Sequence, residues 1–451
     1  MGKKWKNIVI LIASVLFYSW GAPKFVFVIV GSTILDFYLV QQIYRSTKIK
    51  FRKFLLGVSV VMNLGLLAYF KYANFFVENL NTALESIGFT ELAWTSVALP
   101  IGISFYTFQT LTYSIDVYRK VHPPLEKVTD YLMYIMSFPQ MIAGPIVRFS
   151  TIASQITDRK EVVDDKLIGF YRFCIGLAKK VLIANVMAEQ ADLIFDGELT
   201  DISMGTAWIG MLAYTFQIYF DFSGYSDMAI GLGRMMGFRF PENFDSPYIS
   251  KNISEFWRRW HITLGSFMRD YLYIPLGGNR VKSKGRLFFN LWIVFLLSGL
   301  WHGASWNFVI WGAYHGLFLI LDRLFLIRIL NKMGTIVSTL VTFIIVMIGW
   351  VIFRLEDLSL IKVYLSRLFS FEFTLDSSAV PAFWFIAIIA IFFSFFTAFK
   401  RGVKIEKFVF YQESLKISNH YVFTVVSIVL LIMSLISITS SGFNPFIYFR
   451  F

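Results

Sequence analysis

The sequence predicts an all-α, polytopic membrane protein, and two features of its composition lead to that fold class. Of its 451 residues, 57% are hydrophobic and only 16% are charged, whereas soluble domains average about 45–50% apolar and roughly 25% charged residues. The apolar residues lie in long runs that short basic segments separate. A chain with this pattern has lipid as its main solvent. Soluble multidomain, fibrous, disordered and disulfide-rich proteins are therefore excluded.

Eight apolar runs are the clearest candidates for transmembrane helices, because a helix needs about 20 mostly apolar residues to cross roughly 30 Å of hydrocarbon. They are residues 7–20, 25–44, 54–77, 94–113, 208–220, 336–353, 382–399 and 421–438. Two further runs, residues 131–147 and 167–187, contain prolines or charges. We expect these two to be buried, re-entrant or interfacial pieces.

The charges predict an orientation in a cell membrane. Lysines and arginines outnumber acids by 42 to 29, which gives a net charge of +13, and they lie mainly between the apolar runs. This distribution follows the positive-inside rule and argues against a nucleic-acid partner. It places the N-terminus and the basic segment 251–286 in the cytoplasm, and the acidic segment 78–91 outside.

The simplest domain division is one polytopic domain over residues 1–451. Its core is expected at residues 99–320, with peripheral N-terminal helices at 1–91 and C-terminal spans at 336–451. The single cysteine, Cys174, permits no internal disulfide and no cysteine-based metal cage. We expect no metal and no permanently bound cofactor.

His302 is the first candidate site residue. The apolar run 287–297 is only about 16 Å long if helical, so the glycine-flanked segment 298–306 should break at membrane depth. Residues 306–320 then return, which predicts a short helical hairpin with His302 near its tip. A neutral imidazole there can accept a proton from a hydroxyl during acyl transfer. A purely structural, hydrogen-bonded histidine explains the pattern equally well.

His261 is the second candidate. Asn252 and Glu255 approximate a capping box, so a helix should begin there, with His261 on its apolar stripe. Arg258, Arg259 and Arg269 flank that stripe and are available for phosphates. Contact of these arginines with lipid head groups is the simpler interpretation.

Three more polar positions lie in apolar surroundings. Asp221 and Asp227 interrupt the run 213–236; Asp227 is seven residues from Arg234, so the two can pair, and Asp221 either pairs or lines a polar tunnel. His315 is expected to pack or to form a structural hydrogen bond.

Five segments in order resemble the membrane-bound O-acyltransferase family, within it the alginate O-acetyltransferase branch. They are residues 219–231 (YFDFSGYSDMAIG), 241–248 (PENFDSPY), 255–261 (EFWRRWH), 269–278 (RDYLYIPLGG) and 299–306 (GLWHGASW). The resemblance implies a multi-helix membrane bundle with re-entrant segments around a central tunnel. It also implies that His302 is the catalytic histidine and His261 the second polar position near the tunnel.

The resemblance further implies a reaction. The acyl donor would be a cytoplasmic thioester, acetyl-CoA, and the product an O-acetylated extracytoplasmic polysaccharide such as an alginate-like polymer or peptidoglycan, completed by a separate partner protein. Transfer of D-alanine to teichoic acid is the related alternative. A polysaccharide transporter or flippase and a non-catalytic scaffold are the alternatives from other classes of protein.

Overall fold

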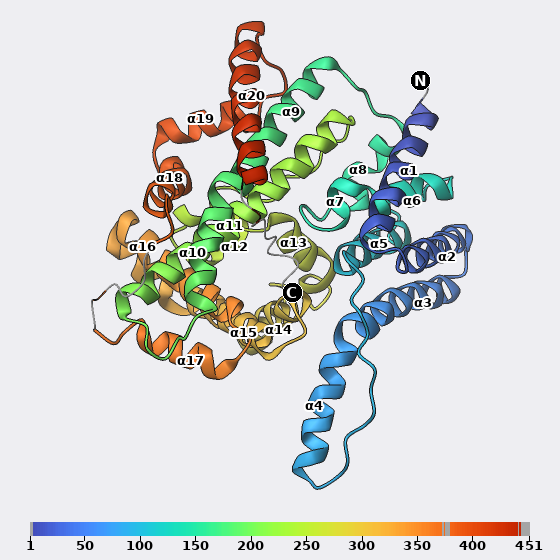
Figure 1. Ribbon diagram of the computed structural model, residues 1–451. Helices are drawn as coiled ribbons and strands as arrows, with labels where there is room; N and C mark the ends of the chain where they lie inside the picture. Colours follow the sequence, from blue (N-terminus) through green and yellow to red (C-terminus); the bar gives the residue numbers. More distant parts are fainter. Residues whose placement is uncertain (1–2, 372–373, 375–378, 441, 443–451) are drawn as a thin grey trace. The chain divides into compact units, whose positions relative to one another are not determined.

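The computed structural model of the protein describes residues 3–371, 374, 379–440 and 442, and every regular element among them is a helix (Figure 1). The all-α prediction is confirmed for this part of the chain. Four helices are long and apolar enough to cross a membrane, and a fifth span is added if one pair bent by 101° is counted. They are Val26–Arg45, Ile49–Ser86, Trp306–Arg354 and Ile417–Ser440, and the bent pair is Phe383–Ala398 with Lys400–Phe410.

The backbone separates into two compact units, and the sequence did not indicate their boundaries. One consists of Met1–Val162 and Met236–Pro241, and the other of Val163–Met235 and Glu242–Phe451. All of the candidate site residues lie in the second unit. The single acyltransferase domain remains a prediction, and residues 372–373, 375–378, 441 and 443–451 of its C-terminal part lie outside the described residues.

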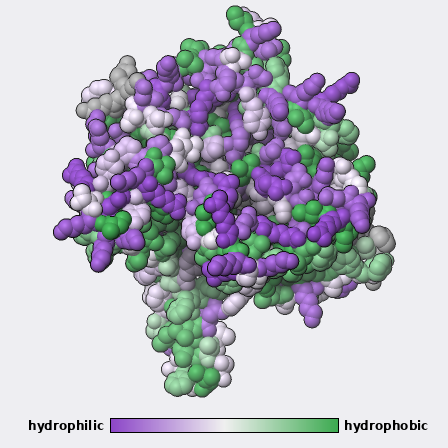
Figure 2. Space-filling view, turned by 180° about the vertical axis from the view of Figure 1, so that it is seen from behind, coloured by the Kyte–Doolittle hydropathy of each residue, from purple (hydrophilic) through white to green (hydrophobic). Residues whose placement is uncertain are grey.

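The first unit contains a helix longer than a bilayer is thick. Helices α3 (Ile49–Leu67), η1 (Ala68–Tyr72) and α4 (Ala73–Ser86) form one run of 38 residues, about 57 Å at 1.5 Å per residue. The other helices of this unit are α1 (Lys3–Gly21), α2 (Val26–Arg45), α5 (Ile103–Tyr118), α6 (Val128–Met136), α7 (Phe138–Met141) and α8 (Phe149–Thr157). Figure 2 shows hydrophobic side chains on the surface of α4. Phe76 of this helix is exposed.

The predicted span at residues 94–113 is wrong in its first half. Residues 90–100 form no regular structure, and α5 begins only at Ile103. Pro100 disfavours helical backbone at the residue before it, and Gly102 caps the helix in a left-handed conformation with φ of 77°. The segment 131–147 folds into the short helices α6 and α7, largely buried, as its prolines predicted.

The second unit is built around two long helices. Helices α9 (Val163–Ala178), η2 (Lys179–Ala184) and α10 (Asn185–Phe195) run on from one another and pack against α11 (Met204–Met235). Gly176 and Gly224 let the two backbones touch, since a Cβ at Gly176 would lie 2.6 Å from the Gly224 carbonyl oxygen. The predicted break at residues 221–227 is absent because α11 is continuous for 32 residues. Both aspartates are paired with cations of the neighbouring helix instead.

The remaining helices enclose an aromatic core next to α11. They are η3 (Pro247–Ile249), α12 (Ile253–Arg259), α13 (Ile262–Phe267), η4 (Met268–Tyr273), α14 (Lys284–His302), α15 (Trp306–Leu321), η5 (Asp322–Leu326), α16 (Ile327–Arg354), α17 (Leu358–Arg367), α18 (Phe383–Phe395), η6 (Phe396–Ala398), α19 (Lys400–Phe410) and α20 (Ile417–Ser440). Trp260, Trp311 and Trp350 are buried in this core with Tyr248 and Phe256. Stacked and tilted contacts between these rings help to fix the positions of α12, α15 and α16.

Candidate active site around His302 and His261

The predicted hairpin is present, and His302 is the last residue of its first helix. Helix α14 continues past the apolar run to His302, and the turn is formed by Gly303, Ala304 and Ser305 before α15 begins. The two helices touch backbone to backbone, because a Cβ on Gly299 would lie only 2.2 Å from the Phe308 carbonyl oxygen. This close packing of small residues fixes the end of α14 and therefore the position of His302.

His302 is buried among aromatic side chains. Its ring centroid lies 5.0 Å from that of Trp301, 5.2 Å from that of Trp311 and 5.3 Å from that of Phe353. Only 9% of the residue is exposed. An imidazole in such apolar surroundings interacts strongly with any charge that develops beside it.

The chain around His261 differs from the predicted single helix. The helix does begin at Asn252, whose side chain accepts a hydrogen bond from the Glu255 backbone N–H as predicted. It ends at Arg259, because Trp260 is extended and His261 has the left-handed angles φ 44° and ψ 53° before α13 begins. A non-glycine residue in this conformation costs about 1–3 kcal/mol, and such residues cluster at functional sites.

Asn243 holds His261 in place and sets its tautomer. The Asn243 Oδ1 atom lies 3.0 Å from His261 Nδ1 and also accepts a hydrogen bond of 2.8 Å from the Thr263 hydroxyl. The amide nitrogen of Asn243 donates to Ser226 Oγ at 3.1 Å, so this network assigns Oδ1 as the acceptor. His261 therefore carries its proton on Nδ1 and presents a lone pair on Nε2. The described residues place no hydrogen-bond partner on Nε2.

The fold brings the two histidines together. Their ring centroids are 6.5 Å apart, although 40 residues separate them in sequence. Burial lowers the pKa of His261 to about 3, so its ring is neutral near pH 7. One bound group of a few atoms can contact both rings, with His302 and His261 sharing the tasks of accepting a proton and orienting the reacting atoms.

The arginines predicted to be available for phosphates are Arg258 and Arg259 on α12 and Arg269 on η4. Arg259 pairs with Asp245 at 3.0 Å and with Glu255 at 3.1 Å, and Arg269 pairs with its neighbour Asp270 at 2.6 Å. Arg258 is exposed. The carboxylates beside Arg259 and Arg269 compete with any phosphate for these two side chains.

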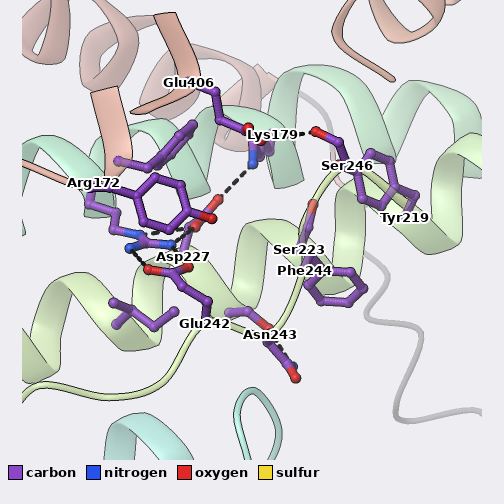
Figure 3. A pocket seen from close by; sticks show the side chains of 14 residues that line it. Arg172, Lys179, Tyr219, Ser223, Asp227, Glu242, Asn243, Phe244, Ser246 and Glu406 are labelled. Carbon is purple, nitrogen blue, oxygen red and sulfur yellow. Dashed lines mark hydrogen bonds and ion pairs between the residues drawn. The ribbon is translucent and has the colours of Figure 1, made fainter. Parts of the chain in front are cut away.

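A buried cluster of charges lies beside Asn243, and the sequence did not reveal its pairing. Arg172 binds Asp227 at 2.8 Å and also Glu242, while Lys179 binds Asp227 at 2.7 Å (Figure 3). The predicted pair of Asp227 with Arg234 is wrong, because Arg234 binds Asp165 at 3.0 Å. Burial opposes ionisation of Asp227, but Lys179 and Arg172 hold its pKa below the usual range.

The π turn at the start of η2 helps to form this cluster. Lys179 and Lys180 are adjacent in sequence, and both contact aspartates of α11. Lys180 lies 3.1 Å from Asp221, so of the two roles predicted for Asp221 the structure shows the ion pair. A space of about 40 Å³ lies within this cluster, and we call it the polar cavity (Figure 3). It is lined by Arg172, Asp227, Glu242, Asn243 and their neighbours. It has room for water or a small polar group. Asn243 links this cavity to His261.

The other sequence candidates have structural surroundings. His315 is fully buried with its ring 5.0 Å from both Trp257 and Trp311, as the packing interpretation predicted. Cys174 is buried. In the described part of the chain, no group of three or more histidine, cysteine or acidic side chains is arranged to hold a metal ion.

The class of protein is defined by a match to a known family. Residues 46–355 match the family described as MBOAT, membrane-bound O-acyltransferase family. The chain therefore belongs to this family and is a multi-pass membrane O-acyltransferase. Family membership decides for an enzyme against the transporter and scaffold alternatives.

The chain is also similar to individual members of this family. A probable alginate O-acetylase, AlgI, of Pseudomonas aeruginosa is 46% identical over 373 residues, which are 82% of this chain and 71% of the relative. The peptidoglycan O-acetyltransferase of Helicobacter pylori is 38% identical over 77% of this chain and 71% of the relative. The teichoic acid D-alanyltransferase of Bacillus subtilis is 29% identical over 56% of this chain and 68% of the relative.

Proposed function

We propose that this protein transfers an acetyl group from cytoplasmic acetyl-CoA toward the outer face of the cell membrane, where it O-acetylates a polysaccharide. The observation that carries the proposal is the buried pair formed by His302, at the tip of the α14–α15 hairpin, and His261, which lies between α12 and α13. The identity of 46% to an alginate O-acetylase supports an acetyl donor and a polysaccharide acceptor. The identity of 38% to a peptidoglycan O-acetyltransferase keeps a cell-wall glycan as the other acceptor.

In the proposed reaction His302 is the general base. Its imidazole accepts the proton of the acceptor hydroxyl as the hydroxyl oxygen attacks the thioester carbonyl carbon. The carbon–sulfur bond then breaks, and the imidazolium returns the proton to the leaving thiolate. A covalent variant places the acetyl group on His302 before a hydroxyl takes it. In both, the neutral His261 either orients the reacting groups, by accepting a hydrogen bond from the acceptor hydroxyl at Nε2, or relays the proton.

The proposal includes an entry side for the acetyl-CoA donor and a partner protein outside the membrane. The thioester would enter from the side of Arg258, Arg259 and Arg269. Arg258 and Arg269 are both exposed, but Arg269 is paired with Asp270, which competes with a phosphate of acetyl-CoA. A separate extracytoplasmic protein would complete transfer to the polymer. D-Alanyl transfer is less favoured, because the D-alanyltransferase relative is 29% identical over 56% of the chain.

The proposal is tested by the acetate content of the cell-surface polysaccharide. A strain that lacks this protein is complemented with wild-type protein, with His302→Ala or with His122→Ala, and membrane levels of each protein are matched. His122 lies in a loop of the first unit and serves as the control. We expect acetate to be lost with His302→Ala and kept with His122→Ala. Normal acetate content with a stably inserted His302→Ala protein would refute the proposal.

A further inference from the structure

The second unit contains a large cavity whose walls are mostly aliphatic and aromatic. This apolar cavity has a volume of about 530 Å³, within the range of about 300–1,000 Å³ that is usual for small-molecule sites. It lies among η2, α11, α18, α19 and α20. Its apolar wall includes Leu182, Val186, Ile389, Phe393, Val409 and Leu430.

Three of the helices around the apolar cavity, α18, α19 and α20, belong to candidate membrane spans. Helix α20 is a candidate span, and α18 with α19 forms the bent candidate pair. Both α18 and α20 pack against η2. Each also has exposed apolar residues, such as Ile388 on α18 and Ile432 on α20. A cavity between membrane-facing helices is filled from the bilayer more readily than from water.

Four of the five described polar residues that line the apolar cavity also line the polar cavity; the fifth is Ser437. Lys179, Tyr219, Ser246 and Glu406 line both the apolar cavity and the polar cavity (Figure 3). The Glu406 carboxylate accepts a hydrogen bond of 2.9 Å from the Ser246 hydroxyl.

Glu406 lacks an ion-pair partner of its own among the described residues. Lys179 is bound to Asp227 at 2.7 Å, and Arg259 is bound to Asp245 at 3.0 Å. A carboxylate at the border of an apolar cavity is costly without a matching cation. The site is therefore suited to a ligand that brings a positive charge next to an apolar chain.

A second cavity adjoins this border and adds cations. This side cavity, of about 750 Å³, is also lined by Ser246 and Glu406, and it contains Lys407 and Arg259. Lys407 follows Glu406 directly in α19. Glu406 and Lys407 both line the side cavity, so it offers both a carboxylate and an ammonium group.

We propose that this site binds a phospholipid whose head group carries an ammonium, of the phosphatidylethanolamine type. An acyl chain fills the apolar cavity, the head-group ammonium contacts Glu406, and the phosphate contacts Lys407. A fatty acid, phosphatidylglycerol or a polyprenyl phosphate brings no cation for Glu406, and acetyl-CoA brings no long apolar chain. The lipid site does not depend on the proposed reaction at His302.

The test measures which lipids stay bound. The purified full-length protein is equilibrated in detergent with equimolar phosphatidylethanolamine and phosphatidylglycerol of identical acyl chains, and bound lipids are counted by native mass spectrometry. Ile389→Trp places a larger side chain inside the apolar cavity and obstructs it, and the matched control Ile388→Trp places the same side chain on the outer face of α18, where Ile388 is 67% exposed. Glu406→Gln removes only the charge at the border.

We expect the wild type and Ile388→Trp to retain phosphatidylethanolamine in preference to phosphatidylglycerol, and Ile389→Trp to lose the bound lipid. Glu406→Gln should lower the preference for phosphatidylethanolamine by about fivefold, the effect of roughly one charge near a head group. Equal lipid retention by Ile389→Trp, an unchanged preference in Glu406→Gln or displacement of the lipid by acetyl-CoA would each overturn the proposal. If Ile389→Trp fails to fold, the preference of Glu406→Gln still decides.

Discussion

Replacement of Asn243 by aspartate tests whether the neutral state of His261 matters for the reaction. Asn243 Oδ1 lies 3.0 Å from His261 Nδ1. The aspartate side chain has nearly the same shape as the asparagine side chain that it replaces. Asn243→Asp therefore keeps the hydrogen bond but adds a negative charge beside the imidazole. An adjacent carboxylate favours the imidazolium form and raises the pKa of the histidine.

The size of the effect follows from the geometry. Two unit charges about 4 Å apart interact by about 4 kcal/mol at an effective dielectric constant near 20. One pKa unit corresponds to about 1.36 kcal/mol, so the pKa of His261 should rise by about three units. Starting from about 3 in the wild type, His261 would titrate near pH 6 in Asn243→Asp. If only the neutral ring supports the reaction, activity of the variant falls about tenfold between pH 7 and pH 5, relative to the wild type.

The assay is thioester cleavage by the protein in lipid nanodiscs, measured from pH 5 to pH 8 with an acceptor polysaccharide present. Ser226→Ala is the control, because it removes the hydrogen bond of 3.1 Å to Asn243 without adding a charge. Its pH profile should follow the wild type. A profile of Asn243→Asp that coincides with the wild-type profile would refute the reasoning about His261.

Two further substitutions test the packing that supports the site. Gly299→Ala places a Cβ within 2.2 Å of the Phe308 carbonyl oxygen, so it should force α14 from α15, cost about 1–3 kcal/mol and reduce activity; Gly285→Ala on the same helix meets no atom within 4 Å and should leave the thermal unfolding temperature unchanged or slightly higher. Arg172→Ala leaves the buried Asp227 with less positive charge and should destabilise the protein by about 3–5 kcal/mol, whereas Arg269→Ala, at an exposed pair, should change stability by less than about 1 kcal/mol. Equal unfolding temperatures within either pair of variants would contradict the corresponding account.

The sequence predicted the parts of this structure that depend on local pattern. The hairpin around His302 follows from short apolar runs on either side of glycines, and the helix start at Asn252 follows from its capping side chain. Both need only residues close in sequence.

Long-range contacts explain what the sequence did not predict. Asp227 has a possible partner seven residues away, but the packing of α9 against α11 supplies Arg172 and Lys179 instead. His261 leaves the helical pattern because Asn243, 18 residues earlier, holds its side chain. A helical wheel cannot show either contact, since each depends on how separate helices pack.

The role of His302 as the base is tested most directly by single-turnover cleavage of acetyl-CoA. Wild-type protein, His302→Ala and His122→Ala are reconstituted in nanodiscs, and transfer of the acetyl group to an acceptor is followed after the folded state of each protein has been verified. A general base contributes about 10²–10⁴-fold to a rate, so His302→Ala should be slower by at least about 100-fold while His122→Ala matches the wild type. Transfer by folded His302→Ala at a rate near that of the wild type would contradict the assignment of His302 as the base.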